Sequence, residues 1–490
     1  MKILFIYPGF VVREVPLNIM YVSAAAKKAG HQCQLFHFTP YKSKSILRST
    51  RELIIEAFEM KMRYYDPDMV AFTVMVQDYM LTCELTKLAK HKYKKTTVWG
   101  GIQPILETDL CFEADGLDYI CTGEGEEVFP LLLECLERDK DPSDIAGIWH
   151  KRNGNVIKND RPYLVQNLDI IDFPDRDLME DKYYNAELIG ANILTARGCP
   201  FPCSFCQNQE LMNIYRGKGH FVRYRSIENV IREMELVIKR YDSPSFYISD
   251  EIFTLNKDRV LDFCKEYKRR IDRPFMIQTR IDRMCDEDMM KALKDGGCFM
   301  INLAIESGND HLRNKILKKN TTREHIYKAF RLAKDHGIMT TSFNMIGVPG
   351  ENIKTIYETI DINREVLPDR ILCSIFMPLP GTALGQYCKE HNLLKSRLEE
   401  TTNYYSQVTV KNDSLSDRTM IGYQGFFDWY VLLSPRWYFF VHLLRLIYQG
   451  LVFPMLPKSQ FFYRIRENIV EFVYQSKRFL PQKTMHVVNR

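Results

Sequence analysis

Three cysteines lie within eight residues in the segment Gly198-Cys199-Pro-Phe-Pro-Cys203-Ser-Phe-Cys206, and no fourth cysteine is near them. Three thiolates can bind three irons of a [4Fe–4S] cluster, which leaves the fourth iron open to a substrate or cofactor. Zinc is the alternative, with His220 downstream, but structural zinc takes four protein ligands and a second histidine is missing. The spacing therefore predicts a reactive iron–sulfur cluster.

The cysteines follow a β-prone run, and the chain after it alternates strands with amphipathic helices. We expect strands at residues 191–196, 245–249, 275–279, 299–305, 339–346 and 371–377, and helices that include 227–240, 286–294 and 323–335. Six βα units predict a partial (β/α)6 TIM-like barrel over residues 187–395, with its chemistry at the carboxyl ends of the strands. The cysteine loop leaves the first of these ends.

The pattern Cys-x3-Cys-x2-Cys, with the aromatic Phe205 before its last cysteine, resembles the signature of the radical S-adenosylmethionine (SAM) superfamily. The resemblance implies that Cys199, Cys203 and Cys206 hold the cluster and that its open iron chelates the amino and carboxylate groups of SAM. One electron from the cluster then cleaves the sulfonium and gives a 5′-deoxyadenosyl radical.

Polar residues follow the later strands, where the resemblance implies SAM binding. Asp250 or Glu251 would accept the SAM amino group, since a carboxylate facing an ammonium forms strong hydrogen bonds. Arg280 would pair with the SAM carboxylate or a substrate anion, and Glu306 would accept the ribose hydroxyls. The predicted SAM contacts are Phe205, Asp250, Glu251, Arg280, Asn302, Glu306, Ser307, Met345 and Ile346. A helix cap is the alternative for any single acid after a strand, but several polar turns at successive strand ends favour a ligand.

The first 140 residues also alternate strands and helices. We expect strands at 2–7, 31–36, 68–74, 96–101 and 118–121, with a helix over 17–26. This order predicts a Rossmann-like, flavodoxin-like, doubly wound parallel sheet with its ligand crevice at the carboxyl ends of the strands. No G-x-G-x-x-G follows the first strand, so a dinucleotide site is disfavoured.

This domain resembles the cobalamin-binding domain that precedes many radical SAM cores, chiefly in its Gly-Gly-x-x-Pro and Gly-Glu-Gly-Glu turns. The predicted cobalamin contacts are Pro8, Leu17, Tyr21, Thr73, Met75, Gln77, Gly100, Gly101, Gln103, Pro104, Gly123 and Glu124. The motif Asp-x-His-x-x-Gly is missing after the first strand, so we expect no protein histidine on the lower face of cobalt. The alternative is a flavodoxin-like domain that has kept only its scaffold.

Two further segments complete the predicted organisation. Residues 141–186 form a linker with a β-hairpin, and residues 396–490 form a helical, aromatic and basic cap on the barrel. Arginines among aromatics are compatible with a lipid surface, an isoprenoid substrate, stacked bases or a plain helical subdomain. No uninterrupted apolar stretch reaches the roughly 18–20 residues of a membrane span, which leaves peripheral membrane contact open.

Composition narrows the function classes. A net charge of +5 over 490 residues gives no argument for nucleic acid. The 13 cysteines are spread through a large chain that opens on a strand without a signal peptide, so we expect reduced thiols and a cytoplasmic protein. The other ten cysteines form no second close-spaced cluster, which disfavours a methylthiotransferase.

The combined resemblance implies a cobalamin-dependent radical SAM methyltransferase. The adenosyl radical would remove hydrogen from an unactivated carbon, and methylcobalamin would then donate a methyl group to that carbon. The alternatives are a radical SAM enzyme for oxidation, cyclisation or rearrangement, and a non-enzymatic metal- or RNA-binding module. The expected partners are a small-molecule or lipid-like substrate and an external one-electron reductant of the flavodoxin or ferredoxin type.

Overall fold

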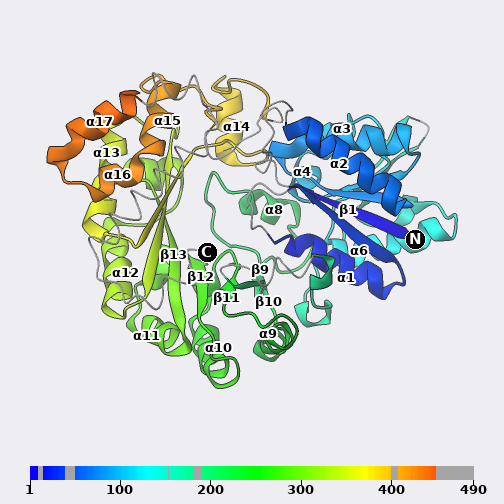
Figure 1. Cartoon of the computed structure of the whole chain (residues 1–490), viewed down its shortest axis with the longest axis horizontal. Helices are drawn as coiled ribbons and strands as arrows, with labels where there is room; N and C mark the ends of the chain where they lie inside the picture. Colours follow the sequence, from blue (N-terminus) through cyan, green and yellow to red (C-terminus); the bar gives the residue numbers. More distant parts are fainter. Residues whose placement is uncertain (9–14, 39–49, 153, 180–189, 399–406, 448–490) are drawn as a thin grey trace.

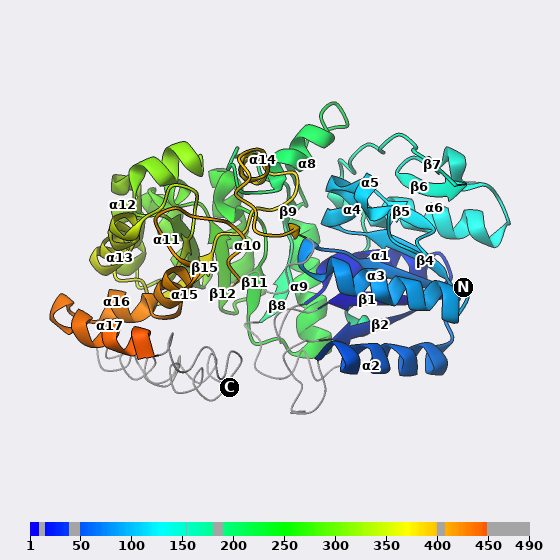
Figure 2. The same ribbon diagram turned by 90° about the horizontal axis from the view of Figure 1, so that it is seen from above.

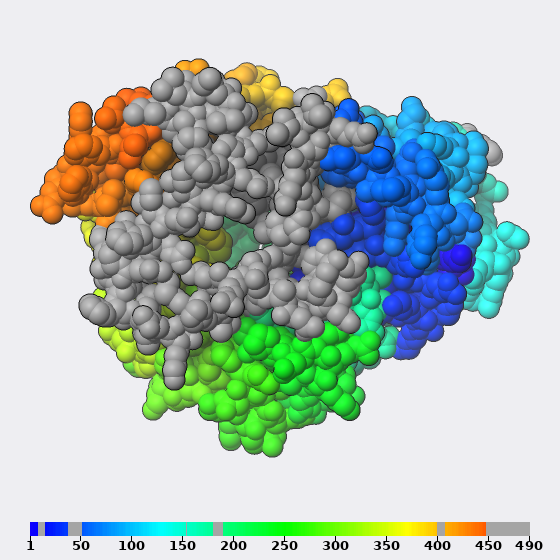
Figure 3. All heavy atoms as spheres, viewed as in Figure 1, coloured from blue at the N-terminus to red at the C-terminus, as the bar shows by residue number. Residues whose placement is uncertain are grey.

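The computed structural model of the chain describes residues 1–8, 15–38, 50–152, 154–179, 190–398 and 407–447. It contains two large sheets, one from the N-terminal third of the chain and one from its middle (Figure 1; Figure 2). In the space-filling view, the blue N-terminal domain and the orange C-terminal helices lie at opposite ends of the molecule (Figure 3).

The N-terminal sheet has the strand order β2-β1-β3-β4-β5-β6-β7. Its strands are β1 (Lys2–Pro8), β2 (Gln32–Phe38), β3 (Met69–Thr73), β4 (Thr96–Gly100), β5 (Tyr119–Cys121), β6 (Ile148–Arg152) and β7 (Asn155–Ile157). The helices are α1 (Leu17–Lys28), α2 (Thr50–Tyr65), α3 (Tyr79–Lys87), α4 (Ile102–Leu106), α5 (Thr108–Cys111) and α6 (Gly125–Glu137). In β1, Leu4 and Ile6 pack in one hydrophobic core while Ile3 and Phe5 pack in another. Both faces are therefore buried, as in a doubly wound sheet, and the predicted fold is confirmed.

The hairpin β6–β7 belongs to this sheet and not to a free linker. Strand β6 pairs antiparallel with β5, with Trp149 opposite Ile120. Trp149 packs against the N-terminal core, and its indole N–H donates to the carbonyl of Asn159 at 2.8 Å. The sheet therefore continues past residue 140, where the sequence ends the first domain, because the hairpin buries its apolar side chains against β5.

The core sheet has the order β15-β14-β13-β12-β11-β8, and all its pairs are parallel. Its strands are β8 (Ala191–Ile193), β11 (Phe246–Ile248), β12 (Phe275–Thr279), β13 (Cys298–Glu306), β14 (Met339–Ile346) and β15 (Arg370–Ile375), and β9 (Ala196–Arg197) and β10 (Arg223–Tyr224) form a separate pair. The helices are α8 (Asn208–Ile214), α9 (Ile227–Tyr241), α10 (Lys257–Arg270), α11 (Glu287–Gly296), α12 (Arg323–Asp335), α13 (Ile353–Val366) and α14 (Ala383–Glu390). Helices α9 to α13 each begin after a Ser, Asn, Asp or Thr whose side chain accepts a hydrogen bond from the first turn. The predicted partial barrel of six βα units is confirmed.

The C-terminal helices are α15 (Asp417–Gly425), α16 (Phe427–Leu432) and α17 (Tyr438–Ile447). They pack beside α13 and β15, where Tyr423, Phe427 and Tyr430 are buried against Ile356 and Ile360. The rest of the predicted aromatic and basic cap, residues 448–490, lies outside the described residues. No helix in the described ranges is both long enough and apolar enough to cross a bilayer.

Candidate active site

The three cysteines of the motif lie on the loop between β9 and α8. Cys199 and Cys203 are buried and Cys206 is half-buried. Gly198 opens the loop with a φ of +91°, and a Cβ there would lie 2.3 Å from the carbonyl oxygen of Phe221. Glycine is therefore required by both conformation and space.

Ser204 fastens this loop to two other parts of the barrel. Its backbone N–H donates to the carbonyl of Leu317 at 3.1 Å, and its hydroxyl donates to the carbonyl of Ile316 at 2.5 Å. Its carbonyl accepts from the N–H of Leu384 at 2.8 Å. The cysteines are thus presented from a backbone held on both sides.

The donor set fits an iron–sulfur cluster. Burial raises the pKa of Cys199 to about 11, whereas the nearby Lys319 and Arg280 partly offset the effect of burial on the pKa of Cys203. Cations beside thiolates favour the charged form that binds metal. No three His, Cys, Asp or Glu side chains in the described ranges are arranged around a single metal ion, and the thiolates of a four-iron cluster bind separate irons.

Asp250 follows β11 and is bonded to the segment between β8 and β9. It is fully buried, and its Oδ1 accepts the N–H groups of Thr195 at 2.6 Å and Ala196 at 3.1 Å, while the Thr195 hydroxyl donates to Oδ2. Burial raises the pKa of Asp250 to about 6. These bonds end β8 and separate it from β9, which corrects the predicted single strand 191–196. They give both carboxylate oxygens of Asp250 protein partners, and its contact with SAM stays a prediction.

Glu251, the neighbouring candidate, lies beside the cluster loop. It interacts with the backbone of Gly198 and acts electrostatically on Cys199. The side chain of Glu251 is exposed to solvent. The protein around it nevertheless disfavours the charged carboxylate and raises its pKa. Between the two acids, the geometry favours Glu251 as the acceptor for a cationic ligand.

Glu306 at the end of β13 is already paired. Its Oε1 accepts from the ammonium of Lys319 at 2.7 Å, and both side chains are nearly buried. The ammonium also lies 5.9 Å from the ring centre of Phe205. Glu306 has a φ of +63°, a conformation that costs free energy and concentrates at functional sites. Any ribose contact would therefore come from an ion-paired carboxylate.

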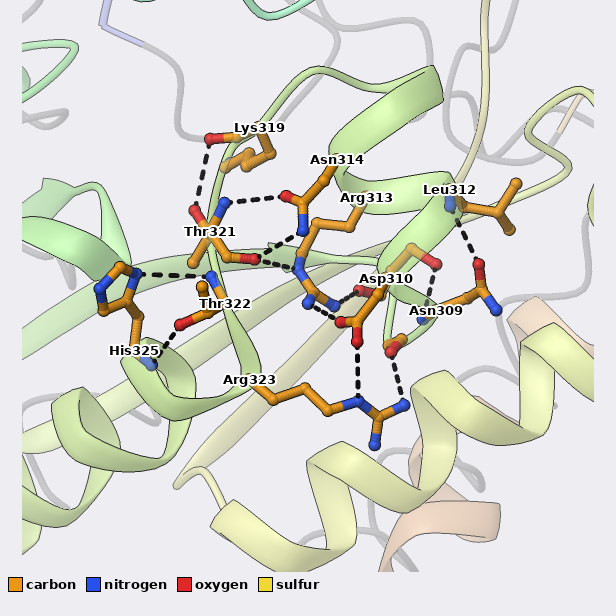
Figure 4. Close-up of polar contacts among 12 residues, drawn as sticks. Asn309, Asp310, Leu312, Arg313, Asn314, Lys319, Thr321, Thr322, Arg323 and His325 are labelled. Atoms are coloured by element: carbon orange, nitrogen blue, oxygen red, sulfur yellow. Dashed lines mark hydrogen bonds and ion pairs between the residues drawn. The ribbon is translucent and has the colours of Figure 1, made fainter.

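The loop that carries Lys319 is built around a buried arginine, Arg313 (Figure 4). Its guanidinium donates to the carbonyls of Ser307 at 2.8 Å and Thr321 at 2.7 Å, and pairs with Asp310. Three backbone and side-chain acceptors on one guanidinium fix the path of the loop. This scaffold explains why Lys319 points at the strand end.

Both residues of the Ser307-Gly308 turn contact other parts of the protein. Ser307 is fully buried, and its hydroxyl accepts from the N–H of Asn309 at 3.2 Å. A Cβ at Gly308 would lie 2.1 Å from the carbonyl oxygen of Glu358, and its N–H donates to the Thr359 hydroxyl at 2.8 Å. The close approach to α13 therefore requires this glycine, and ligand contact at the turn stays a prediction.

The other predicted SAM contacts lie in different parts of the core domain. Phe205 and Met345 pack together in one hydrophobic cluster. Ile346 instead packs among the C-terminal helices, so its side chain points away from the cysteines. Asn302 is buried near the hydroxyl of Tyr247, which donates to Oε1 of Gln278 at 2.8 Å.

Backbone hydrogen bonds link the segments after β3 and β4, which carry several of the predicted cobalamin contacts. Val74 donates its N–H to the carbonyl of Gly100 at 2.9 Å and accepts from the N–H of Gln103 at 3.2 Å. Gly101 has a φ of +97°, and a Cβ there would lie 3.1 Å from the backbone of Val74. The Gln103 side chain is fully buried, and among the described residues neither amide atom has a hydrogen-bond partner. An orphaned buried amide at this edge fits a polar ligand such as cobalamin.

The remaining members of this set lie along the same edge or just beyond it. Those at the ends of β1, β3 and β4 or in α1 and α4 are Pro8, Leu17, Thr73, Met75, Gln77 and Pro104. Gly123 is close-packed for another reason, since a Cβ there would lie 2.6 Å from Pro162. Its smallness serves the contact with the linker.

Glu124, one of the predicted cobalamin contacts, joins the two domains. Its carboxylate accepts from Arg197 at 2.8 Å, from Arg223 at 2.7 Å and from the N–H of Val165 at 2.7 Å. Burial alone would raise the pKa of Glu124, but the two arginines outweigh it and hold the pKa below its usual value. Tyr21, also on the predicted list, packs under the Arg197 guanidinium at 5.3 Å.

Arg197 and Lys319 are the residues that sequence reasoning missed. Arg197 stands directly before Gly198, so its place next to the motif was a usable signal. Lys319 follows Lys318 in a polar loop and carries no such signal. In the view of Figure 1, helix α8, which follows the cysteine loop, lies between the core sheet and the N-terminal sheet.

Comparisons with known proteins agree with this geometry. Residues 193–362 match the family model of the radical SAM superfamily, and residues 10–133 match that of the B12 binding domain. An uncharacterized methyltransferase of Pyrococcus horikoshii is 31% identical over 350 residues, which are 71% of this chain and 73% of the relative. The anaerobic magnesium-protoporphyrin IX monomethyl ester cyclase of Rubrivivax gelatinosus is 26% identical over 87% of this chain and 77% of the relative.

A solved structure with the same fold is the radical SAM methyltransferase TsrM of Kitasatospora setae with cobalamin and a [4Fe–4S] cluster bound. It is 18% identical, with a TM-score of 0.63 over 80% of this chain and 75% of that one. The chain is therefore a radical SAM enzyme, its cofactors are a [4Fe–4S] cluster, SAM and cobalamin, and it belongs to the radical SAM superfamily, among the members with an N-terminal B12-binding domain.

Proposed function

We propose that this enzyme is a cobalamin-dependent radical SAM methyltransferase that acts on an unactivated carbon of a small molecule. The observation that carries the proposal is the direct ionic contact between the turn after β5 and the cysteine loop, through Glu124 and Arg197. It supports a short path between the edge of the N-terminal sheet and the cluster. A methyl donor and a radical generator must both reach one substrate carbon, so short separation matters.

The chain's own groups take separate parts in this proposal. Cys199, Cys203 and Cys206 would hold the cluster, and Glu251 would accept the SAM ammonium. The Gln103 amide would hydrogen-bond to cobalamin. When bound, the cluster supplies one electron to SAM and cobalamin supplies a methyl group. An external one-electron donor is needed because the cluster must be reduced for each cleavage.

A second function has specific support. The Rubrivivax gelatinosus relative is named a cyclase, and it aligns over 87% of this chain. Cyclisation or oxidation without methyl transfer would use the same cluster and the same adenosyl radical. The two functions differ in whether a methyl group leaves SAM.

Peripheral membrane contact or a lipid-like substrate is part of the proposal and is supported by one surface. Trp437, Phe439 and Phe440 near and in α17 are 47%, 71% and 52% exposed. Exposed aromatics can insert into the interface of a bilayer. Co-sedimentation of the full chain with anionic vesicles should fall in the variant Phe439→Ser/Phe440→Ser. Equal binding of the wild type and the variant would contradict membrane contact through this surface.

Two products distinguish the functions. The full chain is reconstituted anaerobically with iron, sulfide and hydroxocobalamin, then reduced with excess dithionite in the presence of SAM. Methyl transfer predicts S-adenosylhomocysteine in an amount close to the bound cobalt, together with slow formation of 5′-deoxyadenosine. Formation of 5′-deoxyadenosine with no S-adenosylhomocysteine would favour the cyclase-like function.

A further inference from the structure

Arg280 was predicted to bind the SAM carboxylate, but its guanidinium lies against the cysteine loop itself. Nη1 donates to Sγ of Cys203 at 3.6 Å, and the guanidinium carbon lies 3.8 Å from the ring centre of Phe201. Phe201 and Cys203 are two residues apart on the loop. One side of the guanidinium is therefore covered by the segment that carries the cluster ligands.

The other N–H groups of the Arg280 guanidinium donate to acceptors of the protein. Nε donates to Asp282 at 2.9 Å, and Nη2 donates to the backbone carbonyl of Lys319 at 2.5 Å. Arg280, Lys319 and Glu306 are all at least nine-tenths buried. Because Arg313 fixes the Lys319 loop (Figure 4), the arginine has little freedom to turn toward another acceptor.

The three cysteines have different surroundings. Cys206 receives a neutral amide donor from Asn208 at 3.7 Å, and Cys199 has the acidic Glu251 as an electrostatic neighbour. Among the described side chains, Cys203 is the cysteine of this motif that has a cationic hydrogen-bond donor. The charge around the motif is thus asymmetric.

Hydrogen bonds to cluster sulfurs are one of the factors that set the reduction potential of an iron–sulfur cluster. The reduced cluster carries one more negative charge, so a cationic donor at a ligand sulfur stabilises it more than the oxidised form. We propose that Arg280 is a positioning residue that acts through Cys203 and raises the reduction potential of the cluster, and that it is not the partner of the SAM carboxylate. This rests on the proposed cluster ligands.

The test compares three variants of the full chain after anaerobic reconstitution. Arg280→Gln removes the cation, Arg280→Lys keeps the charge but loses the planar contacts, and Arg283→Gln is the matched control. Arg283 also neighbours Phe201, at 5.4 Å, and Asp282, at 3.7 Å, but it is not bonded to Cys203. Iron and sulfide are counted first, and a redox titration followed by electron paramagnetic resonance is then run without SAM.

The expected result is a full cluster in Arg280→Gln with a reduction equilibrium about tenfold less favourable, a fall of about 59 mV for one electron. Arg280→Lys should shift less in the same direction, and Arg283→Gln should match the wild type. An unchanged potential in Arg280→Gln with a full cluster would overturn the inference.

Failure of the inference is separable from failure of the proposed function. If the wild-type chain binds no iron, the cluster ligands are wrong and the proposed function fails. If the wild type loads iron but Arg280→Gln does not, the Arg280→Lys variant decides. A lower potential in that variant supports the inference, and an unchanged potential contradicts it.

Discussion

The two sheets present polar side chains at the same kind of edge, but these side chains are satisfied differently. In the core sheet, Asp250 is bonded to Thr195, and Glu306 is paired with Lys319. In the N-terminal sheet, Gln103 is fully buried, and within the described part of the chain its amide has no partner. A polar residue at a strand end is therefore a ligand candidate only when the rest of the chain leaves it free.

The largest expected effect comes from the cysteine loop, which carries the three proposed cluster ligands. Cys203→Ala removes one of three cluster ligands, so iron should fall from about four per chain to near zero and 5′-deoxyadenosine should not form. Metal analysis after anaerobic reconstitution measures this. Cys285→Ala, a half-buried cysteine outside the motif, is the control and should keep its iron. Equal iron in both variants would contradict the ligand assignment.

The second prediction breaks the contact between the two sheets. Arg197→Ala leaves Glu124 and Glu126 without one cation, and removal of one partner from a largely buried pair costs about 3 kcal/mol. Thermal unfolding should begin at a lower temperature, and the linker should be cut faster by protease.

Arg152→Ala is the matched control, because Arg152 pairs with Asp141 on the surface of the N-terminal domain. Exposed pairs contribute little, so we expect its unfolding curve to follow the wild type. A stable Arg197→Ala variant with unchanged proteolysis would mean that the domains are joined mainly by apolar contacts.

The third prediction concerns Glu351, a buried acid of the core that has no paired cation among the residues that the structure describes. Burial raises its pKa to about 8, although the N–H of Gly347 donates to one carboxylate oxygen. Since the folded pKa is above the unfolded value, the stabilisation is complete below about pH 4.5. It is then lost as pH rises toward 8, by up to about 1.4 kcal/mol per pH unit.

Glu351→Gln should flatten this loss, because glutamine does not ionise. The measurement is the melting temperature of both proteins from pH 5 to pH 8, compared as a difference. A difference that stays constant across this range would show that Glu351 is ionised in the folded protein.

The smallest expected effect tests the unsatisfied amide in the N-terminal sheet. Gln103→Met keeps the side-chain volume and removes a buried polar group whose unmade hydrogen bonds cost about 1–3 kcal/mol. The cobalamin-free protein should therefore melt slightly higher, while cobalamin retention on a desalting column should fall. A variant that is less stable without cobalamin would mean that Gln103 has a structural role.

Local patterns predicted most of the architecture. Strand β12 at Phe275–Thr279 and β14 at Met339–Ile346 have the predicted bounds, and in β12 the side chains of Phe275 and Ile277 are buried in the core of the barrel domain. The split between β8 and β9 escaped prediction, since it depends on Asp250, which lies 55 residues away from Thr195 in the chain.

The site was predicted less completely for the same reason. Glu124 follows a strand as a cofactor contact would, yet its partners Arg197 and Arg223 come from another domain. Lys319 acquires its position from the buried Arg313, and no sequence period marks either residue. Contacts between distant segments decide which polar residues remain available.

The most direct test is the metal content of the wild-type chain. After anaerobic reconstitution with iron, sulfide and hydroxocobalamin, followed by removal of unbound material, the account predicts about four irons and one cobalt per chain. The Cys203→Ala variant should keep the cobalt and lose the iron, and Gln103→Met should keep the iron and retain less cobalt. Full iron with no cobalt in the wild type would contradict the central claim that the two sheet edges serve two cofactors.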